Sequence, residues 1–296
     1  MDHAESPGLR PGWVALAALR DWAGLTRLPN ALVAGFGVWL GHACLPGPVD
    51  TRAAWLGSAA MALLAAAGNV QNDVLDLEAD RINRPGRAIP AGRVSPAAAR
   101  RAFFVLYAAA LSAGAALGPA GMGLAAGMAA LLWLYNLNLK SRPLWGNLAV
   151  ATLCALAVYF PEFPSAPSAT AMPAAFALIT TLAREIAKDA EDMPGDLACG
   201  WKTFPIRFGE KAAAGLVAAL IAAVLLLMPV PVTTLGRISH FHGAAYGIVA
   251  ALGPLPLLLA ILGRLAAPAR NWKSIQKLLK GSMFAGMAAI LAGAYA

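Results

Sequence analysis

Two stretches of the chain carry three aspartates at the same spacing, D-x-x-D-x-x-x-D. The aspartates are Asp73, Asp76 and Asp80 in the first stretch and Asp189, Asp192 and Asp196 in the second. A shift of 116 positions superimposes all three pairs, and it also pairs Asn69 with Glu185 and Asn72 with Lys188. This agreement predicts a two-fold internal repeat, with one acidic motif in each half of the chain.

Aspartates at this spacing share one face of a helix, because a helix advances about 100° per residue. In the first motif Asn69 and Asn72 extend that face, so we expect one continuous polar stripe. In the second motif Pro194 is expected to end the helix near Met193, which leaves Asp196 in a loop. The two motifs are therefore expected to differ in backbone structure.

Carboxylates clustered at a membrane surface repel one another and are costly to desolvate. A divalent cation removes this conflict, and magnesium is usually held by one or two carboxylates together with waters and substrate phosphates. We therefore expect all six aspartates to form a magnesium site that binds a diphosphate. The alternative, solvated loop residues in mutual ion pairs, is less favoured because the motif occurs twice. The cations that could neutralise the remaining phosphate charge are Arg81, Arg84, Arg87, Arg93, Lys188, Lys202 and Arg207.

The composition excludes an ordinary soluble protein. Of the 296 residues, 59% are hydrophobic and 13% are charged, whereas soluble domains have about 25% charged residues. The net charge of +8 does not indicate a nucleic-acid-binding protein, because the basic residues occur in short clusters between long apolar runs. The three scattered cysteines predict neither a disulfide framework nor a zinc site.

A membrane-spanning helix needs about 20 apolar residues, and runs of this kind make up most of the chain. The runs without Asp, Glu, Lys or Arg are Leu28–Val49, Ala53–Asn72, Ala102–Leu139, Pro143–Pro161, Phe163–Ala183, Ala212–Gly236, Ile238–Gly263 and Gly281–Ala296. The third run is long enough for two helices, with Gly118 and Pro119 at the turn between them. The sequence therefore predicts an all-α bundle of nine transmembrane helices.

The basic residues divide unequally between the two sides that nine helices imply. The N-terminal segment and the loops after the second, fourth, sixth and eighth helices contain 21 of the 23 Lys and Arg residues. The positive-inside rule places these segments in the cytoplasm. We thus expect one domain over residues 1–296 in the inner or plasma membrane, with a cytoplasmic N-terminal segment (1–27) and two cytoplasmic active-site loops (73–101 and 184–211).

The motifs resemble those of the UbiA-type intramembrane prenyltransferases. The family's N-D-x-x-D-x-x-x-D stands here at 72–80 and is followed by R-P-G-R-A-I-P-A-G-R-V-S at Arg84–Ser95. Two further stretches, L-T-R-L-P-N at Leu25–Asn30 and Y-N-L-N-L-K-S-R-P-L-W-G-N at Tyr135–Asn147, are also similar. The resemblance implies a nine-helix bundle around a central cavity open to lipid, and magnesium-dependent transfer of a prenyl group from a prenyl diphosphate.

Two stretches indicate the acceptor. Arg184–Gly209 and Lys277–Met287 resemble the archaeal digeranylgeranylglyceryl phosphate synthases within this family. This implies transfer of a geranylgeranyl group to a lipophilic acceptor, geranylgeranylglyceryl phosphate, in ether-lipid synthesis. Prenylation of an aromatic acceptor or of chlorophyllide is an alternative, because those relatives share the scaffold. A transporter is a second alternative, although its polar residues would lie near the bilayer midplane rather than at the cytoplasmic helix ends.

Other polar residues of these stretches receive roles in that reaction. Tyr135 is expected to offer its π face to a prenyl cation, and Lys140 and Arg27 are expected to bind the diphosphate or an anionic group of the acceptor. Interfacial anchoring by Tyr135 and charge-directed topology are the alternatives. Asn72 is expected to orient the diphosphate or a metal-bound water. The remaining substrate-binding candidates are Asn30, Asn69 and Asn147.

Overall fold

The structure is a computed structural model that describes residues 11–166, 168–238 and 241–296. Within these ranges the chain is helical and contains no strand, which confirms the predicted all-α class. The helices are α1 (Pro11–Leu25), α2 (Leu28–Cys44), α3 (Thr51–Leu75), α4 (Leu77–Asn83), α5 (Pro96–Ala115), α6 (Pro119–Leu134), α7 (Trp145–Tyr159), α8 (Ala171–Ala198), α9 (Phe204–Phe208), α10 (Glu210–Leu227), α11 (Val230–Ile238), α12 (Gly243–Leu252), α13 (Pro254–Ala266) and α14 (Trp272–Tyr295). Two short turns are the π turn η1 (Tyr135–Leu139) and the 3-10 turn η2 (Phe160–Glu162).

Local sequence signals account for several helix ends. The Asp50 carboxylate accepts a hydrogen bond from the backbone N–H of Ala53 (2.9 Å) and so caps the start of α3. Ser95 caps α5 in the same way through the N–H of Ala98 (3.2 Å). Gly118, with φ of 91°, turns the chain between α5 and α6 just before the proline that begins α6. The predicted break within the long third apolar run is therefore confirmed.

The expected apolar runs coincide with the long helices. Five helical stretches are long and apolar enough to cross a membrane by length and composition: Thr51–Leu75, Pro119–Leu139, Glu210–Leu227, Gly243–Ala266 and Trp272–Tyr295. The chain therefore has the helices of an integral membrane protein.

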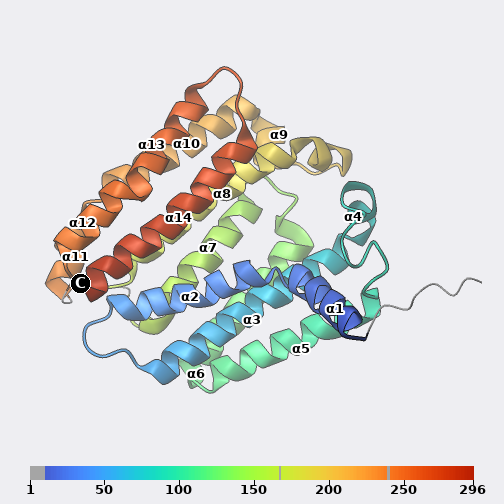
Figure 1. Cartoon of the computed structure of the whole chain (residues 1–296), viewed down its shortest axis with the longest axis horizontal. Helices are drawn as coiled ribbons and strands as arrows, with labels where there is room; N and C mark the ends of the chain where they lie inside the picture. The colour runs from blue at the N-terminus through green and yellow to red at the C-terminus, as the bar shows by residue number, and fades with distance from the viewer. Residues whose placement is uncertain (1–10, 167, 239–240) are drawn as a thin grey trace, which may run out of the picture.

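The helices form two groups, each with a hydrophobic cluster, and a third cluster joins residues of both groups, among them Leu40 and Ala289. The first half, from α1 to η2, buries a cluster that includes Val38 and Met61. The second half, chiefly α8, α10, α13 and α14, buries a separate cluster that includes Ile186, Ile221 and Ile275. In Figure 1 the helices of the first half lie along the lower side of the molecule, those of the second half lie along the upper side, and α7 lies between them. The short helices α4 and α9, each close to one acidic motif, lie at the same end of the molecule, opposite the C-terminus.

The helices that carry the motifs differ from the sequence-based expectation. α8 continues through Pro194 to Ala198, so Asp196 lies in the helix, and the prediction that Pro194 ends it is wrong. Proline removes one helical hydrogen bond, but this helix ends only where Gly200 adopts a φ of 70°. The predicted continuous stripe of the first motif is also wrong, because Asp76 (φ −91°, ψ 10°) interrupts the helix between α3 and α4.

The π turn η1 follows α6 and is fixed against α3. Turns of this type are rare and often occur at functional sites. The buried Asn136 side chain donates a hydrogen bond to Oε1 of Gln71 (3.0 Å), and the same oxygen accepts one from the hydroxyl of Tyr107 (2.8 Å). These bonds set the position of the residues on either side of Asn136.

Candidate active site

One cavity of about 890 Å³ lies between the two halves of the molecule. Residues of both acidic motifs line one end of it. The rest is lined largely by apolar side chains, among them Met61, Leu64, Met128, Phe176 and Met287. A site with this division can hold a molecule that has a charged head and an apolar tail.

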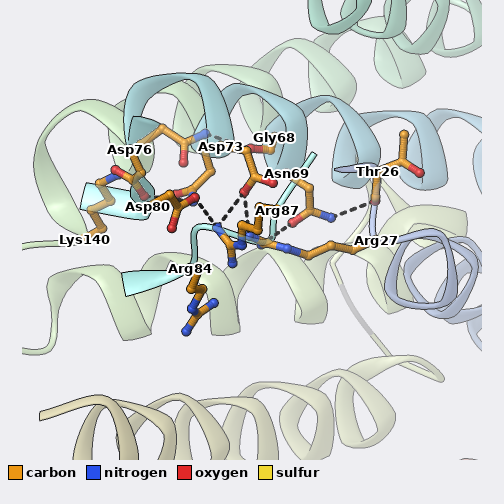
Figure 2. Close-up of polar contacts among 12 residues, drawn as sticks. Thr26, Arg27, Gly68, Asn69, Asp73, Asp76, Asp80, Arg84, Arg87 and Lys140 are labelled. Atoms are coloured by element: carbon orange, nitrogen blue, oxygen red, sulfur yellow. Dashed lines mark hydrogen bonds and ion pairs between the residues drawn. The ribbon is translucent and has the colours of Figure 1, made fainter. Parts of the chain in front are cut away.

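Arg27 lies in the link between α1 and α2, and its side chain contacts the first motif (Figure 2). Its backbone has a φ of 47°, a left-handed conformation that is unfavourable for residues other than glycine. The guanidinium group donates hydrogen bonds to Oδ1 of Asn69 (2.8 Å) and to Oδ1 of Asp73 (3.0 Å). Asn69 in turn donates to the carbonyl of Thr26 (3.0 Å). The strained backbone at Arg27 is therefore held by bonds on both sides of it.

Arg87 joins two aspartates of the first motif. It comes from the loop after α4, and its side chain donates to Oδ1 of Asp73 (3.1 Å) and to Oδ2 of Asp80. Figure 2 shows Arg87 between these two carboxylates. Both aspartates are buried, so the guanidinium group neutralises negative charge that is poorly solvated.

Asp76, at the break between α3 and α4, has two partners. Its Oδ1 contacts the Lys140 ammonium group, and its Oδ2 accepts a hydrogen bond from the Asn72 side chain (2.9 Å). Lys140 also lies 5.4 Å from the centre of the Trp201 ring, on the loop after α8. With Arg27 and Arg87, this lysine gives every carboxylate of the first motif a cationic partner.

The second motif has fewer cationic partners. Asp189 accepts a hydrogen bond from the Asn147 side chain (2.8 Å), and Asp192 lies 3.6 Å from Arg84. Burial raises the pKa of Asp189 to about 7. Burial, together with the negative charge of Asp192, raises the pKa of Asp196 to about 6. These carboxylates therefore favour a proton or another cation more strongly than exposed aspartates do.

Charged residues also lie on α8 just before the second motif, nearer to the apolar part of the cavity. Glu185 accepts a hydrogen bond from Arg184, and its carboxylate lies 4.0 Å from the Lys188 ammonium group. Burial by itself would raise the pKa of Glu185, but the positive charge of Arg184 holds it below the usual range. The charge of Glu185 raises the pKa of Lys188. All three residues line the cavity, so a charged triad lies next to the second motif.

Among the described residues, no three carboxylate, imidazole or thiol groups lie close enough together to bind a metal ion without further ligands. This is compatible with magnesium, which usually takes one or two carboxylates and completes its shell with water and substrate phosphate. Asp76, Asp189 and Asp192 line the same cavity and offer oxygen ligands of the required type. The donor set therefore fits a magnesium ion that binds together with a diphosphate.

Most of the site residues predicted from sequence reach the cavity. Those that line it are Arg27, Asn30, Asn69, Asn72, Asp76, Asp80, Arg84, Arg87, Tyr135, Lys140, Asn147, Lys188, Asp189, Asp192 and Asp196. Asp73 is not part of the lining and is held by Arg27 and Arg87. Four predicted phosphate-binding residues are exposed and do not line the cavity. They are Arg81, which pairs with Glu78 (2.7 Å), Arg93, which pairs with Asp21 (3.0 Å), Lys202 and Arg207.

The cavity also contains residues to which the sequence analysis gave no role. Arg184 and Thr181 line it from α8, and Trp201 lines it from the loop that follows. Arg184 lies one helical turn before Lys188, so helical spacing could have placed it on the same face. Nothing in the sequence indicates the position of Trp201, because a loop sets it.

A model of the UbiA prenyltransferase family matches residues 30–286 of the chain. Similar proteins include the digeranylgeranylglyceryl phosphate synthase of Methanopyrus kandleri, which is 32% identical over 93% of this chain and 99% of the relative. The synthase of the same name from Halobacterium salinarum is 35% identical over 91% of this chain and 95% of the relative.

Solved structures show the same fold. One, described as giving insight into digeranylgeranylglyceryl phosphate synthase in membranes, has a TM-score of 0.74 and 26% identity over 94% of this chain and 99% of its own. Another is a UbiA homolog from Archaeoglobus fulgidus bound to GPP and Mg²⁺, with a TM-score of 0.68 and 18% identity over 91% of this chain and 99% of its own. The two-group arrangement of helices is therefore one that solved membrane proteins adopt.

Proposed function

Because the chain belongs to the UbiA prenyltransferase family, we propose that this membrane prenyltransferase transfers a geranylgeranyl group from its diphosphate to geranylgeranylglyceryl phosphate, in ether-lipid synthesis. The observation that carries the proposal is the cavity, which has both acidic motifs at one end and apolar side chains along the rest. The names of the similar synthases from Methanopyrus kandleri and Halobacterium salinarum support this choice of substrates.

The charged end of the cavity fits the diphosphate of the donor. Magnesium would be held there by carboxylates of the two motifs, Asp73, Asp76, Asp80, Asp189, Asp192 and Asp196, and when bound it supplies positive charge that stabilises the leaving diphosphate. Arg87 and Lys140 neutralise carboxylates in this structure. They can donate to phosphate oxygens once those carboxylates have another cationic partner. Arg27, Arg84 and Lys188 are the other cations of the lining that can reach the phosphates.

The apolar remainder of the cavity fits the prenyl chain. Met61, Leu64 and Met128 contribute to its wall, and such a wall keeps out water, which would capture an allylic cation. Tyr135, at the start of the π turn, lines the same cavity. Its ring can face the carbon that becomes positive when the C–O bond to the diphosphate breaks.

The proposal includes an arrangement in the membrane. The chain crosses it nine times, as two related halves, with the N-terminal segment and both motif loops on the cytoplasmic side of the inner or plasma membrane. The segments placed in the cytoplasm contain 21 of the 23 Lys and Arg residues, which supports this orientation. The identical spacing of the two motifs supports the repeat.

The test uses the purified full-length protein in lipid nanodiscs with radiolabelled geranylgeranyl diphosphate. The acceptors are geranylgeranylglyceryl phosphate, 4-hydroxybenzoate, homogentisate and chlorophyllide, each with magnesium or with a chelator. We expect a labelled ether lipid only with the glyceryl phosphate acceptor and only with magnesium. Transfer to an aromatic acceptor or to chlorophyllide alone would show that the proposed acceptor is wrong.

A further inference from the structure

The faces of α3 and α8 that adjoin the acidic motifs differ in charge. The shift of 116 positions that superimposes the motifs also pairs three residues on each helix, and all six line the cavity. The pairs are Ala65 and Thr181, Gly68 and Arg184, and Asn69 and Glu185. On α3 these positions are uncharged, whereas on α8 they carry an ion pair and a hydroxyl group. The second half therefore has a polar feature that the first half lacks.

The ion pair on α8 leaves part of Arg184 available to a ligand. Glu185 pairs with both Arg184 and Lys188, and the charges of Asp189 and Asp192 also act on Lys188. The Glu185 side chain is 8% exposed and that of Arg184 is 25% exposed. Charges at such sites in membrane proteins are costly and commonly serve a function. A guanidinium group has five N–H donors and the bond to Glu185 uses one of them, so a phosphate in the cavity could accept from the others.

Thr181 adds a buried hydroxyl group to the same wall of the cavity. The residue is 1% exposed, and its hydroxyl, which lies next to the Cys154 thiol, makes no hydrogen bond to a nitrogen or oxygen of the described residues. A buried hydroxyl in this state is unfavourable. Because Thr181 lines the cavity one turn before Arg184, an oxygen of a ligand bound to Arg184 could also accept from it.

Glu185 lies on α8 just before the second motif. It precedes Asp189 by four residues and therefore lies about 6 Å nearer to the apolar part of the cavity. A donor whose diphosphate is held at the motifs has its reacting carbon one bond from the phosphate oxygen. An acceptor that approaches this carbon from the apolar side therefore passes Glu185 before it reaches the aspartates.

We propose that Thr181, Arg184 and Glu185 form the headgroup subsite for the acceptor, in which Arg184 and Thr181 bind the acceptor's phosphate and Glu185 takes the proton of its hydroxyl group. This inference rests on the proposed function, because only an acceptor that has both a phosphate and a free hydroxyl uses all three groups. Lys188, between Glu185 and Asp189, balances the negative charge on either side of it.

In the transfer step the hydroxyl oxygen of the acceptor replaces the diphosphate on the prenyl group. A lone pair of the acceptor's hydroxyl oxygen forms a bond to C1 of the prenyl group. The bond from C1 to the diphosphate oxygen breaks, and its electron pair leaves with the diphosphate. The hydroxyl proton passes to the Glu185 carboxylate and then to solvent. When the acceptor's phosphate engages Arg184, it competes with Glu185 for the guanidinium group, which makes the carboxylate a better proton acceptor at that moment.

The test compares two acceptors in the full-length protein in nanodiscs, geranylgeranylglyceryl phosphate and the dephosphorylated geranylgeranylglycerol. We expect Arg184→Gln to raise KM for the phosphorylated acceptor about tenfold or more. It should change KM for the donor less than about twofold, and it should impair kcat/KM about tenfold more for the phosphorylated acceptor than for the dephosphorylated one. Glu185→Gln should lower kcat about a hundredfold with both acceptors, and it should not raise KM for the phosphorylated acceptor, because Arg184 then has no competing carboxylate. Arg101→Gln, on the exposed face of α5, is the matched control and should change none of these values.

Other outcomes separate the two proposals. If the wild-type protein makes no product from the phosphorylated acceptor, the proposed function fails and the subsite fails with it. If the wild-type protein is active but Arg184→Gln raises KM for the donor, or impairs both acceptors equally, the subsite alone is wrong. Because Glu185→Gln leaves two cations unbalanced, the double variant Arg184→Gln/Glu185→Gln keeps the test valid if the single variant does not fold. The double variant should lose activity with both acceptors, and retained activity would overturn the role of Glu185.

Discussion

The two acidic motifs have the same spacing but different electrostatic surroundings. Asp73, Asp76 and Asp80 each contact a cation, and these cations come from three other segments of the chain: Arg27, Arg87 and Lys140. Asp189 is bonded instead to a neutral amide, and Asp192 has a cation at 3.6 Å. A repeat in sequence is therefore not a repeat in charge, because the partners come from segments that do not repeat.

The difference suggests that the two halves have different roles in the reaction. Each carboxylate of the first motif contacts a cation, although burial also raises the pKa of Asp73, and these cations can move to phosphate oxygens when a metal ion binds. The second motif, with a pKa of about 7 at Asp189 and about 6 at Asp196, is short of positive charge. The charged triad on α8 adds a function on this side only.

Removal of one carboxylate from either motif is expected to have the largest effect on turnover. Asp76→Ala and Asp189→Ala should each lower kcat about a hundredfold to a thousandfold, because each removes a ligand that stabilises the leaving diphosphate. Their effects on stability should differ in metal-free protein. Asp76→Ala leaves Lys140 without its carboxylate and should lower Tm, whereas Asp189→Ala removes an unfavourably buried carboxylate and should not. Equal changes of Tm in the two variants would contradict the comparison.

Much of the fold can be predicted from the sequence because apolar length and turn chemistry act locally. The break at Gly118, before Pro119, is an example. The backbone of the motifs could not be predicted in this way. α8 continues through the exposed Pro194 at the cost of one helical hydrogen bond. In the first motif the helix is interrupted at Asp76, between α3 and α4, where no glycine or proline indicates a break.

The candidate site was predictable in its residue types but not in its pairings. Spacing places the aspartates on one face of each helix, but it does not show that Arg87 folds back onto Asp73 and Asp80 or that Lys140 reaches Asp76. These contacts depend on how a loop and a π turn pack against α3. For the same reason Arg81, which stands close to the first motif in sequence, pairs with Glu78 at the surface.

Loss of a side-chain partner should destabilise the first motif more than the second. Arg87→Gln leaves the buried Asp80 carboxylate without its cation and should lower the free energy of unfolding by about 2–3 kcal/mol. Asn147→Ala removes one hydrogen bond to Asp189 and should lower it by about 1 kcal/mol. Thermal unfolding of both variants in detergent, in the presence of a chelator, measures the difference. A larger loss in Asn147→Ala would reverse the comparison.

The second motif should also confer a pH dependence. Since the pKa of Asp189 rises from 3.8 to about 7 on folding, the folded state binds this proton more tightly than the unfolded state. In metal-free protein the contribution of Asp189 to stability is therefore present below pH 4 and is lost as the pH rises toward 7. Magnesium competes with the same proton, so its affinity should fall up to about tenfold per pH unit below 7. Titration of the magnesium affinity between pH 5.5 and 8 measures this, and Asp189→Asn should weaken the dependence.

The smallest expected effect concerns Arg81 and Arg84, two arginines that follow the first motif in sequence. Arg84 lines the cavity and lies 3.6 Å from Asp192, so among the described ion pairs it is the one that joins the two motifs. Figure 2 shows its side chain pointing away from Asp80. Both partners are partly exposed, at 47% and 34%, so the pair contributes about 1 kcal/mol at most.

Arg84→Gln should therefore lower kcat/KM for the donor by only about fivefold or less. The matched variant Arg81→Gln removes a charge of the same sign three residues earlier, from a side chain that is 57% exposed and paired with Glu78, and it should change kcat/KM less than about twofold. Steady-state kinetics at low and high salt separate the two, because only the Arg84 effect should diminish as salt screens its contact. If both variants lose activity equally, the general positive charge of this loop matters, and not the contact between the two motifs.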